Sequence, residues 1–149
     1  MAAATGAKIS FSEGRDKECR MSKYLGGYYS PSRHEIVLCN ENSEPAREIA
    51  RTIVHEVVHA YQACINGPVP FGHPNIDNHL TVREARHIAN SYPKSQHWME
   101  VNARKISNLI ADEDFFAGAT LQSRVDQACG DMKSAMRSLG STRGIRKLH

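Results

Sequence analysis

The chain has 149 residues, of which 40% are hydrophobic and 23% charged, and its formal net charge is +3. These values are typical of one globular domain with a core, and they argue against wholesale disorder. The mild positive charge does not indicate a nucleic-acid partner, because the basic residues of such proteins cluster on one face. No apolar run approaches the roughly 20 residues of a membrane span, so we expect no transmembrane segment.

The N-terminal part is predicted to hold little regular structure. Residues 1–18 are expected to form an irregular arm. Glycine and proline in residues 26–31 indicate a turn, and residues 34–39 form a short β-prone run that ends at residues 40–42. We therefore expect a small hairpin, with Tyr28 and Tyr29 on one strand and residues 36–38 on the other.

The rest of the chain is predicted to be helical. A first helix over residues 45–65 should stop at Asn66-Gly67-Pro68. Further helices are expected over residues 78–91, 96–111 and 120–139, and residues 112–114 should form an acidic turn. In the third of these four helices the expected core residues are Trp98, Val101, Ile106 and Ile110. This order of elements predicts an α+β fold, with one domain over residues 19–140 and a basic tail over residues 141–149.

The first predicted helix carries the sequence His55-Glu56-Val57-Val58-His59, an H-E-x-x-H motif. Residues four positions apart lie on the same face of a helix, so His55 and His59 can bind one metal ion. Glu56 lies beside them, where it can take a proton from a metal-bound water as general base. Apolar residues recur at helical spacing behind the motif. The alternative is a surface helix that carries two histidines by chance.

A catalytic zinc site needs a third protein ligand, because three protein ligands leave a fourth position for water. Glu84 is the preferred candidate, since a carboxylate on a neighbouring helix completes many sites of this kind. His79 is the second choice, and Glu84 could instead be a surface acid paired with an arginine. The candidates that follow the motif are His73, Asp77, His79, Glu84 and His87.

The four cysteines contain no C-x-x-C pair, so a zinc ribbon is not expected. They could form two disulfides in an oxidising compartment or remain buried thiols, and composition alone leaves both possibilities open.

Several motifs between Cys19 and about Met132 are similar to those of one known family. They are Cys19 with Gly26-Gly27-Tyr28 and Pro31, the stretch Ile36-Val37-Leu38-Cys39-Asn40, the motif helix with Ala60-Tyr61 and Cys64, His79-Leu80 with Glu84-Ala85-Arg86, and Val125-Asp126. Together they resemble the mitochondrial, inner-membrane-associated zinc metalloprotease family that processes and helps assemble ATP synthase subunit 6. Glu84 falls on a motif position of that family, which supports it as a ligand independently of the ligand count.

The chain also departs from the family pattern. Gln62 stands where the family usually has an acidic residue, and Val82 and Lys94 stand where it has cysteines. Met132 lies near another expected cysteine. We therefore expect fewer disulfides than the family has, and a metal site that is altered if the family's acidic residue at position 62 tunes or binds the metal.

The resemblance implies a zincin-like α+β metalloendopeptidase with Zn²⁺ bound by His55, His59 and Glu84. It implies a place in the mitochondrial intermembrane space, peripheral to the inner membrane, and a polypeptide substrate or partner such as an ATP synthase subunit in an inner-membrane-associated complex. In that compartment we expect at least one disulfide, between Cys19 and Cys39. The alternative function is a non-catalytic assembly factor that uses the same fold as a binding surface.

Overall fold

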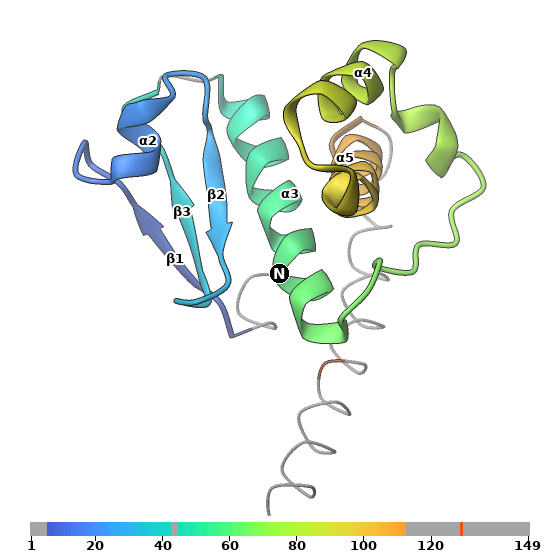
Figure 1. Ribbon diagram of the computed structural model, residues 1–149, viewed down its shortest axis with the longest axis horizontal. Coiled ribbons are helices and arrows are strands. Elements are labelled where there is room, and N and C mark those ends of the chain that lie inside the picture. Colours follow the sequence, from blue (N-terminus) through green and yellow to red (C-terminus); the bar gives the residue numbers. More distant parts are fainter. Residues whose placement is uncertain (1–5, 43–44, 113–128, 130–149) are drawn as a thin grey trace, which may run out of the picture.

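The computed structural model describes residues 6–42, 45–112 and 129, and it confirms the predicted α+β fold (Figure 1). A small sheet comes first in the chain and the longer helices follow. The elements are β1 (Lys8–Phe11), α2 (Lys17–Met21), β2 (Gly27–Ser30), β3 (Glu35–Leu38), α3 (Ala46–Ile65), the 3-10 helix η1 (Ile76–His79), α4 (Val82–Ser91), the 3-10 helix η2 (Lys94–Gln96) and α5 (His97–Asp112).

The sheet has three strands in the order β1-β3-β2. The predicted hairpin is confirmed, since β2 runs antiparallel to β3 with Tyr28 opposite Val37 and Tyr29 opposite Ile36. The expectation of an irregular arm over residues 1–18 is wrong, because this segment contains β1 and the beginning of α2. Strand β1 pairs in parallel with β3, more than 20 residues further along the chain. A four-residue strand with so distant a partner leaves almost no local signal.

Helix α3 packs against one face of the sheet and separates it from α5 (Figure 1). Ile36 and Leu38 of β3 meet Val57, Val58 and Tyr61 of the helix in the main core, and all five are at most 5% exposed. Alternation along β3 places Val37 on the opposite face, where it packs with Cys19 and Cys39. The motif helix is therefore held from behind by the sheet.

Gly27 allows β2 to lie close to α3. A Cβ atom at this position would come within 2.7 Å of the Val37 carbonyl oxygen and 3.2 Å of Thr52 Cγ2. Any larger residue would push the strand away from the helix. Gly27 therefore lets β2 lie against both β3 and the motif helix.

The end of α3 follows the sequence prediction. Asn66 adopts the left-handed conformation (φ 53°, ψ 46°), and the backbone N–H groups of Asn66 and Gly67 both donate to the carbonyl oxygen of Gln62. Asparagine and glycine tolerate this conformation, which satisfies helix carbonyls that would otherwise lack partners. The break fixes where the chain turns toward η1 and α4.

The next two predicted helices are present with altered beginnings. The segment over residues 78–91 is divided into η1 and α4, and α4 begins only after Thr81, whose side chain caps it. Helix α5 starts at His97, close to the expected residue 96. Trp98, an expected core residue, is 44% exposed, whereas Ile106 is fully buried. The predicted fourth helix over residues 120–139 and the tail over residues 141–149 lie outside the described residues, apart from Cys129.

Two disulfides join distant parts of the fold. The expected bond between Cys19 and Cys39 is confirmed, although Cys19 lies on α2 and not on the hairpin, so the bond ties that helix to the end of β3. The second joins Cys64, in the last turn of α3, to Cys129. Each helix that the structure describes is too short or too polar to traverse a lipid bilayer.

Candidate metal centre

His55 and His59 lie on the buried face of α3, one turn apart. The helical spacing brings their Nε2 atoms to 3.1 Å from each other. Two nitrogens bound to one zinc ion at about 2.0–2.1 Å in a tetrahedron would lie roughly 3.3 Å apart, so the observed separation fits a shared metal. The structure therefore brings together the two histidines that the motif predicts as ligands.

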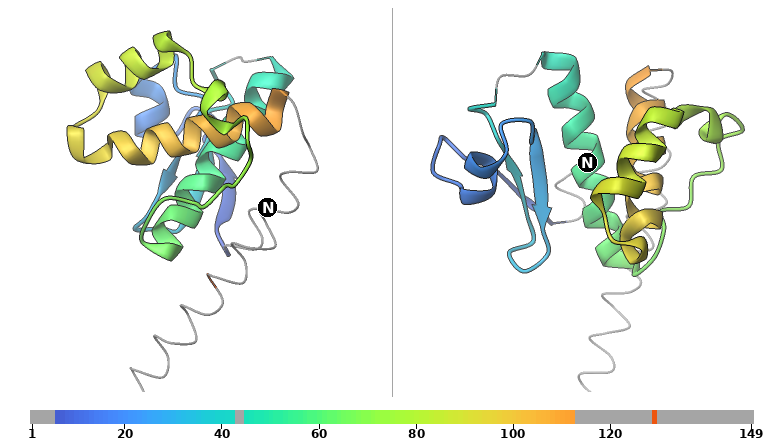
Figure 2. Two further views of the ribbon diagram at one scale, coloured as in Figure 1. Left: turned by 90° about the vertical axis from the view of Figure 1, so that its right-hand side faces the viewer. Right: turned by 45° about the horizontal axis from the view of Figure 1, so that its top comes forward.

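The third group at this point is Glu100 of α5. Its Oε2 lies 3.3 Å from His55 Nε2 and its Oε1 lies 3.3 Å from His59 Nε2. The three ligand atoms lie within 4.8 Å of one another, and Glu100 is only 8% exposed. Helix α5 runs across α3 (Figure 2). This crossing places the Glu100 carboxylate beside the two histidines. Two histidines and a carboxylate are a donor set of catalytic zinc sites.

Sequence analysis missed Glu100, although the sequence holds one signal for it. Glu100 lies three positions before Ala103 and six before Ile106, on the stripe of α5 that is fully buried. An ionisable residue on the apolar stripe of an amphipathic helix needs a partner inside the fold. That partner is the histidine pair.

Glu84, the expected third ligand, does not lie with the histidines. One carboxylate oxygen accepts hydrogen bonds from the backbone N–H and the hydroxyl of Thr81, both at 2.9 Å. The other oxygen accepts from Asn108 Nδ2 at 3.0 Å. Burial would raise the pKa of Glu84, but the hydrogen bond from Asn108 and those from Thr81 outweigh it and lower the pKa. In this structure Glu84 therefore caps α4 and ties it to α5, and Glu100 takes the place beside the histidines.

None of the other candidates belongs to this cluster, although His87 lines the same cleft, with its Nδ1 3.3 Å from Ser91 Oγ. His79, the second choice, belongs to η1, and its backbone carbonyl accepts a hydrogen bond from Asn108. Asp77 forms an ion pair with Lys105 at 2.6 Å. His73 accepts a hydrogen bond from the backbone N–H of Asn75. Within the described residues, the only cluster of three possible ligands is the one that contains Glu100.

Glu56 lies next to the cluster and is 7% exposed. Burial is the main influence on its carboxyl group and raises its pKa to about 7, even though the nearby His59 and a hydrogen bond from the Tyr29 backbone N–H favour the charged form. The bond from Tyr29 holds the carboxylate between β2 and α3. A carboxyl group with a pKa near neutrality is suited to accept and release a proton.

The charges of the three clustered groups are coupled. Burial lowers the pKa of His55 to about 4, which keeps its imidazole neutral. Burial opposes the charged forms of Glu100 and His59 as well. The hydrogen bonds of Glu100 with His55 and His59 outweigh burial and lower the pKa of Glu100, and the hydrogen bond with Glu100 together with the charge of Glu56 raises the pKa of His59. Of the two histidines, His59 therefore has the higher affinity for a proton. A cation bound to the same atoms would replace that proton.

A cleft of about 940 Å³ opens above the cluster. Residues of β2 and the loop before it line one side, and residues of α3, α4 and α5 line the other. Tyr24 and Trp98, which are 82% and 44% exposed, lie among the lining residues. Arg104 also lines it, one turn of α5 beyond Glu100, and its positive charge lowers the pKa of both Glu56 and His55. The cleft is large enough to admit a segment of polypeptide.

Comparison with known proteins gives one match. The model of the Peptidase M76 family matches residues 3–79, just over half of the chain. No curated protein and no solved structure matches the chain significantly. The matched segment contains the sheet and α3 with His55, Glu56 and His59, and it ends before α4 and α5, which carry Glu84 and Glu100.

Proposed function

The chain belongs to the Peptidase M76 family, a family of metallopeptidases, and from this premise we propose that it is a zinc-dependent endopeptidase. The observation that carries the proposal is the convergence of His55, His59 and Glu100 within 4.8 Å in the wall of the cleft. In this proposal these three residues hold the metal, and Glu84 has a structural role at the start of α4.

The donor set and its surroundings support zinc as the metal. Nitrogen and carboxylate oxygen donors suit Zn²⁺, and three protein ligands leave a position for water. When bound, Zn²⁺ supplies Lewis-acid chemistry, which makes a water molecule more acidic and polarises the scissile carbonyl. The neutral state of His55 favours binding, because only an unprotonated imidazole nitrogen can act as a ligand.

Glu56 is the general base of the proposed reaction. Its carboxylate accepts a proton from the attacking water and then donates it to the nitrogen of the leaving amine, so the group ends the cycle in its starting state. The backbone N–H of Tyr29 orients the carboxylate during both transfers. The low exposure of Glu56 limits competition from bulk water for the same proton.

The substrate and location are proposed from the family resemblance. We place the protein in the mitochondrial intermembrane space, peripheral to the inner membrane, where it processes an ATP synthase subunit or helps to assemble it within a membrane-associated complex. The Cys19–Cys39 and Cys64–Cys129 disulfides support an oxidising compartment. The cleft supports a polypeptide substrate, because it is open at the surface and has exposed aromatic side chains among its lining residues.

The test is the variant Glu56→Gln, measured in purified full-length protein and in mitochondria. We expect zinc content to be unchanged, cleavage to fall by about 10²–10⁴-fold, and an uncleaved precursor to accumulate. Glu48→Gln is the matched control, because it removes an acid from the same helix and the same cleft but lies about two turns from the histidines. Normal cleavage with Glu56→Gln would contradict the enzymatic function and favour the non-catalytic assembly factor.

A further inference from the structure

Gln62 is a buried polar residue behind the metal centre that the proposed reaction does not use. It is 2% exposed and lies on α3, one turn beyond His59. Its Oε1 lies 2.8 Å from Nδ1 of His59, the ring nitrogen that faces away from the cluster. A buried amide in this place controls which ring nitrogen of His59 carries a proton.

The orientation of the Gln62 amide is settled by its other two contacts. Its Nε2 donates to the backbone carbonyl of Met99 at 3.0 Å and to Asn102 Oδ1 at 2.9 Å. A backbone carbonyl can only accept a hydrogen bond, so the amide nitrogen must face α5 and the amide oxygen must face His59. The reversed amide would place its oxygen against two other acceptors, the Met99 carbonyl oxygen and Asn102 Oδ1.

Asn102 is fixed in turn by the chain that follows α3. Its Oδ1 accepts from the backbone N–H of Val69 at 2.9 Å, and its Nδ2 donates to the Val69 carbonyl at 3.1 Å. This pair of bonds leaves one orientation for the Asn102 side chain. The donor and the acceptor are therefore fixed at each bond that joins Val69, Asn102 and Gln62, and the Gln62 oxygen faces His59.

We propose that Gln62 is a positioning residue that keeps the proton of His59 on Nδ1 and so leaves Nε2 free to bind the metal. If Nδ1 of His59 carried no proton, its lone pair would face a lone pair of Gln62 Oε1 at 2.8 Å. The amide oxygen cannot relieve this repulsion, because it can only accept a hydrogen bond. His55 offers an internal contrast. Its buried Nδ1 has no hydrogen-bond partner within the part of the chain that the structure describes. The two histidines of the motif are thus held by different means.

The same series also links the metal centre to the packing of α3 on α5. Asn102 is two residues beyond Glu100 on α5, and Gln62 is three beyond His59 on α3. The hydrogen bonds from Gln62 to Met99 and Asn102 fix how α5 lies along α3, and so where Glu100 meets the histidines. The inference rests on the proposed function for its effect on zinc, whereas the position of the proton on His59 can be measured without any metal.

The experiment compares Gln62→Met with wild type and with a control, Gln96→Met. Gln96 lines the same cleft, is exposed, and has no side-chain hydrogen bond among the described residues. The position of the proton is read from nitrogen-15 NMR spectra of the histidine rings in metal-free protein, at a pH where both histidines are neutral. Zinc affinity is measured by competition with a chelator.

We expect Nδ1 of His59 to carry the proton in wild type and in Gln96→Met. In Gln62→Met the proton should move to Nε2, where Glu100 Oε1 lies 3.3 Å away as an acceptor. Zinc affinity should fall about 10–100-fold, the usual effect of removing the partner of a ligating histidine. Gln62→Glu should keep the proton on Nδ1, because a carboxylate also accepts there, even if repulsion from Met99 and Asn102 lowers stability.

Three results would overturn the inference. One is a bare Nδ1 on His59 of the neutral wild-type protein. Another is an unchanged proton position or unchanged zinc affinity in Gln62→Met. A third is loss of the Nδ1 proton in Gln62→Glu, which would reduce Gln62 to a packing role. Failure of the wild-type protein to bind zinc would instead contradict the proposed function, and the proton position would still decide the role of Gln62.

Discussion

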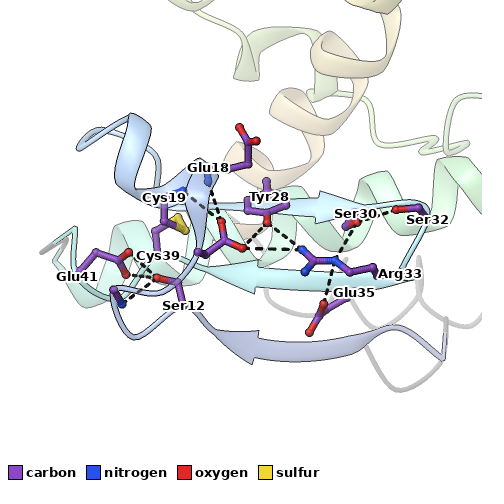
Figure 3. A network of polar contacts seen from close by, with 12 residues as sticks. Ser12, Glu18, Cys19, Tyr28, Ser30, Ser32, Arg33, Glu35, Cys39 and Glu41 are labelled. Carbon is purple, nitrogen blue, oxygen red and sulfur yellow. Dashed lines mark hydrogen bonds and ion pairs between the residues drawn. A yellow bond between two sulfur atoms is a disulfide. The ribbon is translucent and has the colours of Figure 1, made fainter.

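The two sides of the sheet-and-helix unit differ in how their polar groups find partners. On the face of the sheet turned away from α3, Tyr28 donates to Asp16 at 2.7 Å, and Arg33 donates to the Tyr28 hydroxyl at 2.9 Å and pairs with Glu35 at 3.3 Å (Figure 3). Each donor there faces an acceptor. At the metal centre, by contrast, three groups that can act as ligands point their lone pairs at one location.

The outer face therefore contributes to stability by itself, whereas the metal centre needs a bound proton or cation. A polar network in which donors match acceptors is complete without any further component. A cluster of two imidazoles and a carboxylate is satisfied only by an added proton or cation, as the raised pKa of His59 beside Glu100 indicates. We therefore expect changes at the metal centre to alter binding and activity, and changes at the outer face to alter stability alone.

The largest effect should come from Glu100→Ala, compared with Glu84→Ala. Loss of a metal ligand should cost more than the ~10–100-fold in affinity that supporting residues typically contribute, so zinc should no longer bind stoichiometrically. Glu84→Ala should retain zinc and lower the free energy of unfolding by about 1 kcal/mol, because it breaks the cap of α4. Zinc titration and urea unfolding measure the two effects.

This pair of variants decides between Glu84, the ligand expected from sequence, and Glu100, the carboxylate that lies beside the histidines in the structure. Retention of zinc in Glu100→Ala together with its loss in Glu84→Ala would restore the sequence-based assignment.

The next effect should come from removing the disulfide on the outer face. Replacing Cys19 and Cys39 together by alanine should lower the free energy of unfolding by about 2–4 kcal/mol, because the bond closes a loop between residues 20 positions apart. Zinc affinity should not change, since the metal centre lies on the other side of the sheet. A marked fall in zinc affinity of the folded double variant would contradict the separation of the two regions.

The smallest effect should be a change in acid stability in Asp16→Asn. The hydrogen bond from Tyr28 is the main cause that lowers the pKa of Asp16 below its usual value of 3.8. A carboxyl group with a lowered pKa in the folded state stabilises the protein above its unfolded-state pKa, and this contribution is lost as the pH falls through the folded-state value. Wild type should therefore lose more stability between about pH 5 and pH 2 than Asp16→Asn does.

The measurement is urea unfolding at a series of pH values, with Glu18→Gln as the control. Glu18 belongs to the same short helix, but no side-chain contact joins it to Tyr28 or Arg33 within the described residues, so this variant should keep the wild-type acid dependence. Asparagine at position 16 can still accept the capping bonds from the backbone of α2. Parallel pH profiles for wild type and Asp16→Asn would show that this network contributes nothing to acid stability.

Features that depend on neighbours a few residues apart follow from local sequence patterns. The spacing of His55, Glu56 and His59 is fixed by helical geometry, and the structure places them as that geometry requires. The stop at Asn66 follows from the conformation that asparagine tolerates. The hairpin follows from the β-prone run at residues 34–39 and the tyrosines before it, but its turn comes after β2 and not over residues 26–31, most of which form that strand. The α+β order of elements follows from these local patterns.

Which carboxylate meets the histidines depends instead on how the helices pack against one another. Glu84 and Glu100 both lie on helices that follow the motif, and no local rule says how either helix crosses α3. The pattern Thr81-x-x-Glu84 is also a capping box, in which the Glu84 carboxylate hydrogen-bonds to Thr81 at the start of its own helix. Glu100 instead lies on the buried stripe of α5, and the packing of that stripe on α3 brings it to His55 and His59. Strand β1 is a second case, because a parallel pairing depends on a partner far along the chain.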